Sequence, residues 1–573
     1  MRMIQNKAHN SNPASSEQSN TDPFQLGTIA LARGTDSARS IDPDDLNEHF
    51  YILGRSGTGK SNLLRQLAVA DAARGSGLCF IDPIGSTAEE LVKDLSRQAA
   101  TSASCKPASQ LDASLGAPGR DAMLEGSDDA SERDSDCVPG LSGSSAVPYS
   151  DKDIIYLDAA DVDHPIGINP LYNVDVEDRA KTVSDILQMF EGIWHDTGWG
   201  PRMESIFRAA LHTLVENPHC MRPSLLTVFR LLLDETFRAE TKTAIANKQV
   251  LDWWDFRFDR GDLNCRTRRE WVEPVLNKID TLSLDPVIRN IIGQPRCSLD
   301  FEEIIQRKQI LIVNLNQNKI GLDNAAFIGM LILSRIRQAA AKVGTRDQPF
   351  TLTLDEAHSF PTMELTKIIH QGRHSGLFAR LAHQNLEQFD RKIGSALRNG
   401  CGSLAIFGVG SRDAETIVDD LEHQHRDRCL EMINMLERGQ CFLRLTQDGA
   451  PQPPSSYPTS IMHRSGKEDA AYADKLLQGV INRTRERFAI SRLTAEFQIA
   501  FAHDEFTRDD HLKWKAMFRG ERRDRSKEHN NRKRVKEKNK EANRASNFGG
   551  AATELQNLAN HLFSNGTVNP QTS

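Results

Sequence analysis

The sequence has no long hydrophobic run, and this absence excludes a large class of proteins. No stretch among its 573 residues approaches the roughly 18–20 uninterrupted apolar residues that a membrane-spanning helix needs. The longest candidate, residues 325–333, is followed by Ser334, Arg335 and then Arg337. We therefore expect no transmembrane segment in this sequence.

Cysteine and aromatic residues are also scarce. The nine cysteines are scattered, form no C-x-x-C pair and follow no signal peptide, which argues against a disulfide-stapled secreted protein and favours the reducing cytoplasm. Aromatic residues make up 6% of the chain and hydrophobic residues 39%, which indicates that part of the chain is not packed. The length allows roughly three or four domains of about 100–200 residues each.

Three segments have the composition of unpacked or solvent-exposed chain. Residues 1–23 are rich in Ser, Asn, Gln and Pro, which predicts a disordered arm. In residues 101–150, 27 of 50 positions are Ser, Ala, Gly or Pro, which predicts a flexible insertion inside a folded domain. Residues 513–544 hold 14 Lys or Arg and five Asp or Glu, a local charge of +9 in a chain of −7. This stretch fits either a tail that binds nucleic acid or a membrane surface, or a solvated charged helix.

Between these segments, short β-branched runs alternate with helical patterns, as in a parallel sheet covered by helices. From residue 174 to about 290 the apolar residues instead recur three and four positions apart, which predicts an all-α region. We therefore expect an α/β fold with a mainly parallel central sheet and an inserted all-α domain. The clearest strands are predicted at residues 49–53, 78–81, 154–157, 309–315, 350–354, 377–382, 403–409 and 440–445.

A glycine-rich segment after the first predicted strand has the pattern of a phosphate-binding loop, or P-loop. Residues 54–61 fit G-x-x-x-x-G-K-[ST], and a helical pattern follows them. Backbone N–H groups of such a loop surround a phosphate at a helix N-terminus, where unpaired donors and the helix dipole favour an anion. We expect Lys60 to reach the β- and γ-phosphates of ATP and Ser61 to bind Mg²⁺. The predicted nucleotide-binding residues are Gly54, Arg55, Ser56, Gly57, Thr58, Gly59, Lys60, Ser61 and Asn62.

An acidic pair at the end of another predicted strand offers the remaining groups that hydrolysis needs. Asp355 and Glu356 directly follow the apolar run at residues 350–354. We expect Asp355 to hold the metal and Glu356 to orient or activate the attacking water. Residues 355–358 also spell the DEAH box of one helicase superfamily. The box lies 295 residues after Lys60, however, which is far longer than in those helicases, and their later motifs are not seen.

Several segments, taken in order, resemble the HerA/FtsK superfamily of DNA-pumping ATPases and, within it, the conjugative DNA-transfer ATPases known as type IV coupling proteins. The resemblance spans about residues 26–447. It implies a RecA-like P-loop NTPase that binds ATP and Mg²⁺ and acts on DNA as a hexameric ring, with a relaxase or secretion-channel protein as a further partner. The segments are residues 49–61, 80–85, 168–171, 199–204, 354–358, 371–384 and 438–442.

The resemblance also assigns residues at particular positions. Arg373 matches an arginine finger that reaches into the site of a neighbouring subunit, and Gln384 matches a glutamine that senses the γ-phosphate. A surface arginine and an ordinary strand-end amide are the competing interpretations. Asp82 ends the second predicted strand and remains available to the site. In the helical domain, the candidates for DNA contacts are Arg266, Arg268 and Arg269. The competing interpretation is that these arginines form a solvated charged face.

We expect an ATP-hydrolysing ring motor that translocates DNA in conjugative or type IV secretion-type transfer. Two alternatives stay open: a HerA-like translocase or helicase in repair or defence, and a nucleotide-gated scaffold that binds relaxase or secretion partners. Coupling proteins normally begin with transmembrane helices, and no such segment is predicted in this sequence. We therefore expect this chain to be cytoplasmic and to reach the inner membrane only through partners. The expected parts are an arm at 1–23, the ATPase domain at 24–173 and 301–460, the all-α domain at 174–300, a helical extension at 461–512 and a basic, then polar tail at 513–573.

Overall fold

A computed structural model describes most of the central part of the chain, which belongs to one compact unit. The arm predicted at 1–23, most of the insertion predicted at 101–150 and the tail predicted at 513–573 lie outside the described residues. The described residues are 29–30, 40–41, 47–104, 149–194, 198–216, 223–259, 265–360, 363–421, 426–447, 450–451, 455–458 and 467–502.

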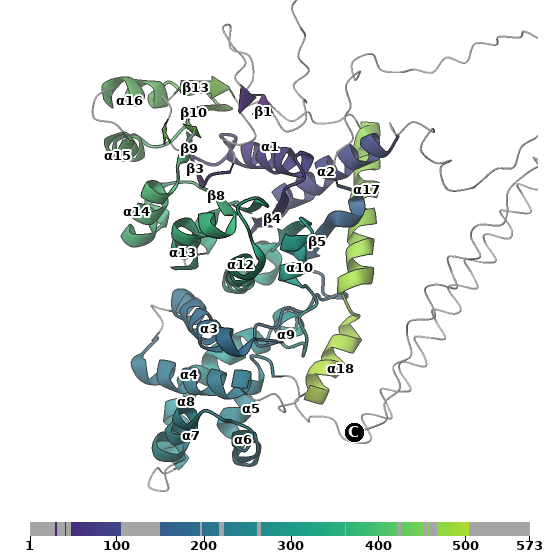
Figure 1. Cartoon of the computed structure of the whole chain (residues 1–573), viewed down its shortest axis with the longest axis vertical. Helices are drawn as coiled ribbons and strands as arrows, with labels where there is room; N and C mark the ends of the chain where they lie inside the picture. The colour runs from purple at the N-terminus through teal and green to yellow at the C-terminus, as the bar shows by residue number, and fades with distance from the viewer. Residues whose placement is uncertain are drawn as a thin grey trace, which may run out of the picture. The chain divides into compact units, whose positions relative to one another are not determined.

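Nine strands in the described part of the chain form one sheet in the order β13-β10-β9-β3-β8-β7-β4-β6-β5 (Figure 1). The seven strands from β9 to β5 are parallel, and β10 is antiparallel to both β9 and β13. The strands are β3 (Phe50–Leu53), β4 (Gly77–Asp82), β5 (Ile154–Asp158), β6 (Ile310–Asn314), β7 (Phe350–Leu354), β8 (Leu377–His383), β9 (Ser403–Ile406), β10 (Gln440–Arg444) and β13 (Ser455–Pro458). All eight strands predicted from the sequence are present, with small differences at their ends. The expected α/β fold with a mainly parallel sheet is therefore confirmed.

Helices cover the sheet and build the region between β5 and β6. The longer ones are α1 (Lys60–Ala73), α2 (Ser86–Ser104), α3 (Arg179–Trp194), α4 (Pro201–Glu216), α8 (Cys265–Ser283), α12 (Leu322–Val343), α14 (Arg391–Gly400), α15 (Ser411–Leu421), α17 (Lys467–Phe488) and α18 (Arg492–Ala502). The shorter ones are α5 (Thr227–Leu233), α6 (Glu235–Lys242), α7 (Lys248–Trp253), α9 (Pro286–Ile292), α10 (Phe301–Gln306), α11 (Gln317–Ile320), α13 (Met363–Gln371) and α16 (Arg426–Asn434). Short 3₁₀ turns at the site are η7 (Ala357–Ser359), η8 (Gly372–Ser375) and η9 (Leu386–Gln388).

The sheet is buried on both faces, which explains why its strands read as continuous apolar runs. In β4, Leu78 and Phe80 pack in one core with side chains of α1, α2 and α17, whereas Cys79 and Ile81 pack in the other with side chains of α12 and α13. Successive side chains of a strand point to opposite faces, so this alternation follows from the strand itself. The two covered faces leave the carboxyl edge of the parallel strands as the place where loops meet.

The inserted helical region shares its core with the sheet domain. The Phe190 ring of α3 lies edge-on to Phe207 of α4, with ring centroids 4.7 Å apart, and to Phe327 of α12, at 5.4 Å. All three rings are buried. Figure 1 shows α3 to α9 gathered on one side of the sheet, in the lower half of the view. The helices expected between residues 174 and 290 are thus present, and α12 is the element on which they rest.

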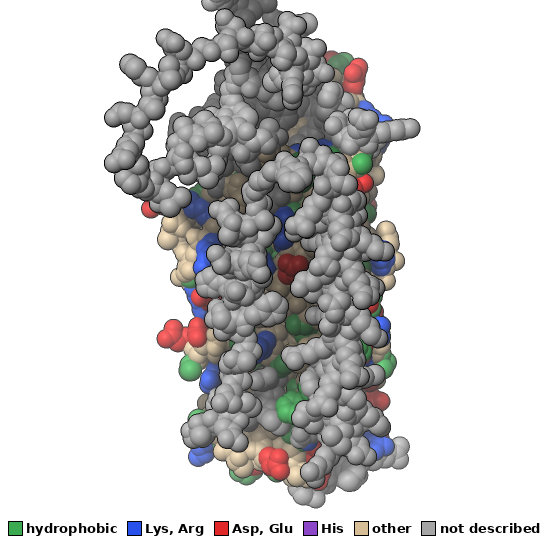
Figure 2. Space-filling model, turned by 90° about the vertical axis from the view of Figure 1, so that its right-hand side faces the viewer, with side chains coloured by type: hydrophobic (Ala, Val, Ile, Leu, Met, Phe, Trp, Pro, Cys, Tyr) green, Lys and Arg blue, Asp and Glu red, His purple; other side chains and the backbone are tan. Residues whose placement is uncertain are grey.

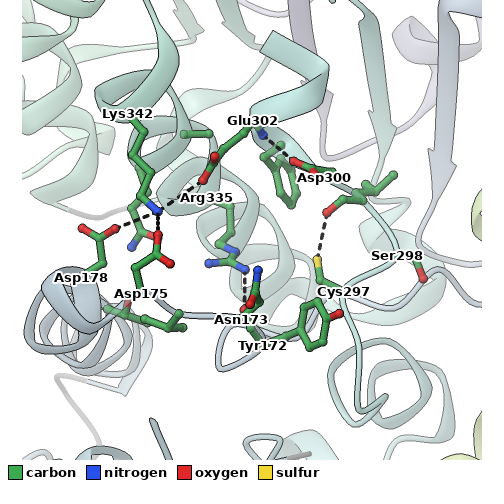
Figure 3. A pocket seen from close by; sticks show the side chains of 16 residues that line it. Tyr172, Asn173, Asp175, Asp178, Cys297, Ser298, Asp300, Glu302, Arg335 and Lys342 are labelled. Carbon is green, nitrogen blue, oxygen red and sulfur yellow. Dashed lines mark hydrogen bonds and ion pairs between the residues drawn. The ribbon is translucent and has the colours of Figure 1, made fainter. Parts of the chain in front are cut away.

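One lysine holds both chain segments that connect the helical region to the sheet domain. Lys342 Nζ, in the last turn of α12, lies 2.5 Å from Asp175 Oδ2 and 3.0 Å from Asp178 Oδ2 where the chain enters the region. It also lies 3.3 Å from Glu302 Oε1 where the chain leaves (Figure 3). Arg335 Nη2 donates to the Tyr172 carbonyl beside them at 3.4 Å. These side chains surround a cavity of about 370 Å³.

A buried ion-pair network joins α3, α12 and α13 below this cavity. Asp185 of α3 lies 2.5 Å from Arg337 Nη2 and 3.1 Å from Lys367 Nζ, and it is 2% exposed. Glu364 of α13 is fully buried and pairs with the same two cations. The two buried carboxylates are therefore balanced by two cations, the buried Arg337 and the partly exposed Lys367.

No helix in the described segments is both long enough and apolar enough to cross a membrane. The face that carries α17 and α18 shows Lys and Arg as well as Asp and Glu among its visible side chains (Figure 2). Ion pairs on these two helices agree with that view, since Lys93 lies 2.8 Å from Asp474 and Arg492 lies 2.8 Å from Glu496. The visible part of this face is therefore mixed in charge.

Candidate active site

The glycine-rich segment forms a loop between β3 and the first turn of α1. Gly57 and Gly59 have φ values of 74° and 123°, a region that favours glycine, so the loop can fold back on itself. A Cβ on Gly54 would lie 2.5 Å from the Phe407 side chain, so glycine is also needed where the loop approaches the end of β9. Residues 54–59 thus lead into the N-terminus of α1, at Lys60 to Asn62, where backbone N–H groups suit an anion.

Lys60 lies beneath this loop. Its side chain is buried, and Nζ donates to the carbonyl oxygens of Gly54 at 2.6 Å and of Arg55 at 3.2 Å. Burial lowers the pKa of Lys60, whereas the nearby Glu356 and Asp355 carboxylates raise it. The ammonium group is therefore held at the loop by carbonyl dipoles that an anionic phosphate can replace.

Asp355 and Ser61 meet beside Lys60. Ser61 Oγ donates to Asp355 Oδ2 at 2.7 Å, and Thr87 Oγ1, from the first turn of α2, donates to the same oxygen at 3.2 Å. Burial raises the pKa of Asp355 to about 6, while the Ser61 hydrogen bond opposes that shift. The three side chains present only oxygen atoms, the donor set that hard cations prefer.

Asp82 contacts this cluster indirectly, through the backbone of the first turn of α2. Its Oδ2 accepts from the backbone N–H groups of Thr87 at 2.8 Å and Ala88 at 3.0 Å, and Oδ1 accepts from Ile84 N at 2.8 Å. These bonds hold the start of α2 and so place Thr87 beside Asp355. Asp82 was a candidate from the sequence, whereas Thr87 was not predicted, because a threonine in the first turn of a helix has no distinctive pattern.

Glu356 faces the same space from the turn after β7. Its backbone φ of 47° is left-handed, a strained conformation that for a glutamate costs of order 1–3 kcal/mol and is common at functional sites. Gln384 Nε2, from the turn after β8, donates to Glu356 Oε1 at 3.0 Å. Since β7 and β8 are parallel neighbours, their carboxyl ends bring these two residues together.

Arg373 lies away from this group in the same chain. It belongs to η8, before β8, and its Nη2 lies 2.5 Å from Glu48 Oε2, just before β3. The seven-residue strand β8 separates Arg373 from Gln384, and strands extend by about 3.3 Å per residue, so roughly 20 Å lies between the two ends. The structure thus brings together Lys60, Ser61, Asp355, Glu356 and Gln384, and places Arg373 at the opposite edge of the sheet.

Two further residues contact the loop. Arg438 Nε donates to the Gly57 carbonyl at 3.0 Å, and Gly439 N donates to the Thr58 carbonyl at 3.0 Å. Both residues belong to a segment that carries the family resemblance, but no contact with the loop was predicted for them. They close the outer side of the loop before β10 begins.

The arginines proposed for DNA contacts have different surroundings. Arg268 lies 2.6 Å from Glu235 Oε1 and over the Phe258 ring, so it already has partners within the helical region. Arg269 is exposed. The side chain of Arg266 lies outside what the structure describes.

No family model matches the sequence, and no curated protein matches it. The structure is similar to the plasmid coupling protein TrwB in complex with the non-hydrolysable ATP analogue ADPNP, with 15% identity, a TM-score of 0.48, and 76% of this chain and 92% of that chain covered. It is also similar to TrwB in complex with ADP and Mg²⁺, with 15% identity, a TM-score of 0.47, and coverages of 77% and 93%. VirB4 of Thermoanaerobacter pseudethanolicus matches with 11% identity, a TM-score of 0.46, and coverages of 77% and 98%. Every one of these TM-scores is below 0.5, so the function proposed for this chain rests on its own residues.

Proposed function

We propose that this chain binds ATP with Mg²⁺ and hydrolyses it to ADP and phosphate. The observation that carries the proposal is the hydrogen bond between Ser61 and Asp355, directly beside Lys60 and the P-loop. If the glycine-rich turn only capped a helix, a buried lysine and a buried carboxylate beside it would have no function. Nucleotide hydrolysis gives each of them a task.

The residues present fit a magnesium ion. Ser61, Asp355 and Thr87 supply hydroxyl and carboxylate oxygens, and within the described ranges no cluster of three or more His, Cys, Asp or Glu residues could hold a metal alone. Mg²⁺ commonly takes one or two protein oxygens and completes its shell with water and phosphate oxygens. We assign Ser61 and Asp355 as its ligands. When bound, the ion would supply neutralisation of negative charge on the phosphate oxygens.

The remaining residues divide the work of hydrolysis. Lys60 would exchange the Gly54 and Arg55 carbonyl oxygens for phosphate oxygens, while the backbone N–H groups of residues 54–62 hold the phosphate chain. Glu356 would orient the attacking water and accept its proton, and Gln384 would hold Glu356 in place. The water oxygen bonds to the γ-phosphorus as the bond from that atom to the bridging oxygen of ADP breaks.

Arg373 would complete the site of a second copy of this chain. Its place at the amino edge of the sheet keeps it from the nucleotide of its own chain, so a finger role requires a neighbouring subunit. A guanidinium at the transferring phosphoryl group is worth about 10³–10⁵ in rate in well-studied phosphoryl transfer. This geometry supports an oligomer, and the resemblance to ring-forming ATPases favours a hexamer.

The task proposed for this ATPase is DNA translocation in conjugative or related type IV secretion-type transfer. The ordered motifs shared with DNA-pumping ATPases support it, as does the need for a neighbouring subunit. A relaxase or secretion-channel protein is the partner that this role implies. A nucleotide-gated scaffold is less favoured, because a scaffold has little need of a strained glutamate beside a phosphate loop.

The test is the ATPase rate across protein concentration, with and without single- and double-stranded DNA, for the wild type, Glu356→Gln and Arg373→Ala. We expect stimulation by DNA, a rate per subunit that rises with protein concentration, and loss of activity in both variants. Arg307→Ala serves as the control, because Arg307 is a surface arginine with 68% side-chain exposure. Tight ATP binding with negligible turnover under all conditions would replace the motor with the scaffold.

A further inference from the structure

Glu356, Gln384, Gln388 and His358 form a ring of contacts around the proposed water-activating carboxylate. Gln384 Nε2 donates to Glu356 Oε1 at 3.0 Å, and Gln388 Oε1 accepts from Gln384 N at 2.8 Å. Gln388 Nε2 lies 3.2 Å from His358 Nε2. His358 Nδ1 in turn lies 3.4 Å from Glu356 Oε2, so the contacts almost return to their starting residue. The ring joins the turn after β7 to the turn after β8, and neither His358 nor Gln388 has a role in the mechanism proposed above.

Backbone contacts fix which way the Gln388 amide points. Its Oε1 accepts from two N–H groups, those of Gln384 at 2.8 Å and Asn385 at 3.1 Å. Both lone pairs of this oxygen are therefore used. Turning the amide over would set its NH₂ group against two N–H donors. The NH₂ group of Gln388 must consequently face His358.

This orientation determines where His358 carries its hydrogen. Because the Gln388 Nε2 group is a donor, His358 Nε2 must accept, so the neutral imidazole carries its hydrogen on Nδ1. Nδ1 is also the ring nitrogen that lies 3.4 Å from Glu356 Oε2. Both Glu356 Oε2 and His358 Nδ1 are buried atoms with no other hydrogen-bond partner. One atom is a donor and the other an acceptor, so a reorientation of the His358 ring would form a hydrogen bond between them.

We infer that His358 and Gln388 are positioning residues, which hold the Glu356 carboxylate between Gln384 and His358 in the orientation needed to take a proton from water. The inference rests on the proposed function for its consequence in catalysis. One Glu356 oxygen is held by Gln384 and the other by His358, so the carboxylate cannot rotate away from the phosphate loop. A left-handed glutamate backbone persists only where surrounding contacts hold it, and the Gln384 hydrogen bond is one such contact.

Burial, rather than the charged groups nearby, favours the neutral form of His358. Burial lowers the pKa of His358, Glu356 raises it, and Lys60 lowers it. His383 lies close enough to interact with it electrostatically. Protonation would place an Nε2–H group against the Gln388 NH₂ group, and the ring would open there. The neutral tautomer is therefore part of the arrangement.

The first experiment compares His358→Ala with His358→Asn in steady-state hydrolysis. We expect kcat to fall at least about tenfold in His358→Ala with KM for ATP within about twofold, because the ring positions the base without binding phosphate. Asparagine carries an N–H donor at the same distance from the backbone as His358 Nδ1, so His358→Asn should recover kcat to within about threefold. His374→Asn, at an exposed histidine, is the matched control. Equal defects in the two His358 variants, or an unchanged kcat in His358→Ala, overturn the inference.

The second experiment does not depend on turnover. In protein labelled with ¹⁵N in its histidine rings, the His358 signals, identified by their loss in His358→Asn, should show a neutral ring protonated at Nδ1. Gln388→Glu keeps the acceptor for the two backbone N–H groups but replaces the NH₂ donor by an oxygen, so His358 should become charged at neutral pH. An Nε2–H tautomer in the wild type overturns the inference. If the wild type does not hydrolyse ATP, the proposed function fails and so does the catalytic role of His358 and Gln388. The ¹⁵N spectrum would still show which His358 ring nitrogen carries the hydrogen.

Discussion

Ser61 Oγ donates a hydrogen bond to Asp355 Oδ2 at 2.7 Å, although the two residues are 294 positions apart in the sequence. Ser61 lies in the first turn of the helix that follows β3, and Asp355 directly follows β7. In the sheet, β8 lies between these two strands, so the hydrogen bond bridges one strand at the carboxyl edge. This contact is where the P-loop and the acidic strand end become one site.

Replacing either partner should weaken the use of Mg²⁺ more than the binding of nucleotide. For Asp355→Asn and Ser61→Ala we expect kcat to fall by about 10²–10³, because the ion loses a ligand beside the phosphates. Affinity for nucleotide measured in EDTA should change little. Titration of a fluorescent ATP analogue with and without Mg²⁺, together with turnover, measures both effects.

The control for this substitution is the ligand-free stability of the protein. Burial raises the pKa of Asp355 to about 6, so the carboxyl group is still mostly ionised at pH 7.5, but keeping it ionised in the folded state costs free energy. Asp355→Asn should therefore unfold no more easily than the wild type at pH 7.5. Asp347→Asn, at an exposed position, should match the wild type in every assay. A variant that loses stability as well as activity would point to a structural role for Asp355.

Local patterns predicted the phosphate side of the site. The spacing of Gly54, Lys60 and Ser61 is set within one loop, and the loop in the structure has the expected strand before it and helix after it. Asp355 and Glu356 were predictable because they end an apolar strand. By contrast, Thr87 contacts Asp355 across 268 positions, and the two meet because of the tertiary packing of α2 and the Asp82 hydrogen bonds to its first turn.

Other features could not be predicted because they depend on side-chain packing rather than on spacing. The Glu48 carboxylate and Arg373 lie close to Gly402, where an added Cβ would come within 3.1 Å of Glu48 Oε2. The edge strand β13 was missed because Ser455–Pro458 has no apolar run and includes a proline. Proline is tolerated at a sheet edge, where its missing N–H group needs no partner.

Mixing two inactive variants should restore activity if Arg373 acts on a neighbouring subunit. Arg373→Ala keeps its own Glu356, and Glu356→Gln keeps its Arg373. In randomly mixed rings with equal amounts of each, about a quarter of the interfaces pair an intact Glu356 with an intact Arg373. We therefore expect the mixture to recover roughly a quarter of the wild-type rate, measured as ATP turnover after subunit exchange. A mixture as inactive as its components would place Arg373 in some other role.

His49 should make the protein sensitive to mild acid. Burial and the nearby Arg373 lower the pKa of His49 to about 3, against 6.5 for an exposed histidine side chain. Below about pH 6.5 His49 is therefore protonated in the unfolded chain but stays neutral in the folded state. The contribution of His49 to the free energy of unfolding is complete above about pH 6.5 and is lost as the pH falls towards 3. Between pH 7 and pH 5 the loss is about 2 kcal/mol for this group.

The measurement is the free energy of unfolding by urea at pH 7 and at pH 5. His49→Asn keeps an acceptor for the Ala379 N–H group, which donates to His49 Nδ1 at 3.0 Å in the wild type. Its stability should fall less between the two pH values than that of the wild type. His370→Asn, at an exposed histidine, should show the wild-type slope. Equal slopes for all three proteins would show that His49 is not kept neutral.

The buried network around Asp185 should respond to charge balance rather than to the number of hydrogen bonds. Asp185→Asn leaves Arg337 and Lys367 facing Glu364 alone, and an uncompensated buried charge costs about 3–5 kcal/mol. Adding Arg337→Gln removes the excess cation and leaves Lys367 paired with Glu364 at 2.6 Å. The double variant should therefore be more stable than Asp185→Asn, although it lacks one more native side chain.

Chemical unfolding of the single and double variants measures the coupling between the two positions, and additive losses would contradict a network held by charge balance. Lys342→Gln provides the comparison, because Lys342 and its partners Asp175 and Glu302 are partly exposed. Solvent screens such pairs, so its loss should cost less than about 1 kcal/mol. The contrast matters for function, because α13 links Glu356 to Arg373 and is held against the helical region by the buried network. A helical region that moves during hydrolysis would act on the site through Asp185 and not through Lys342.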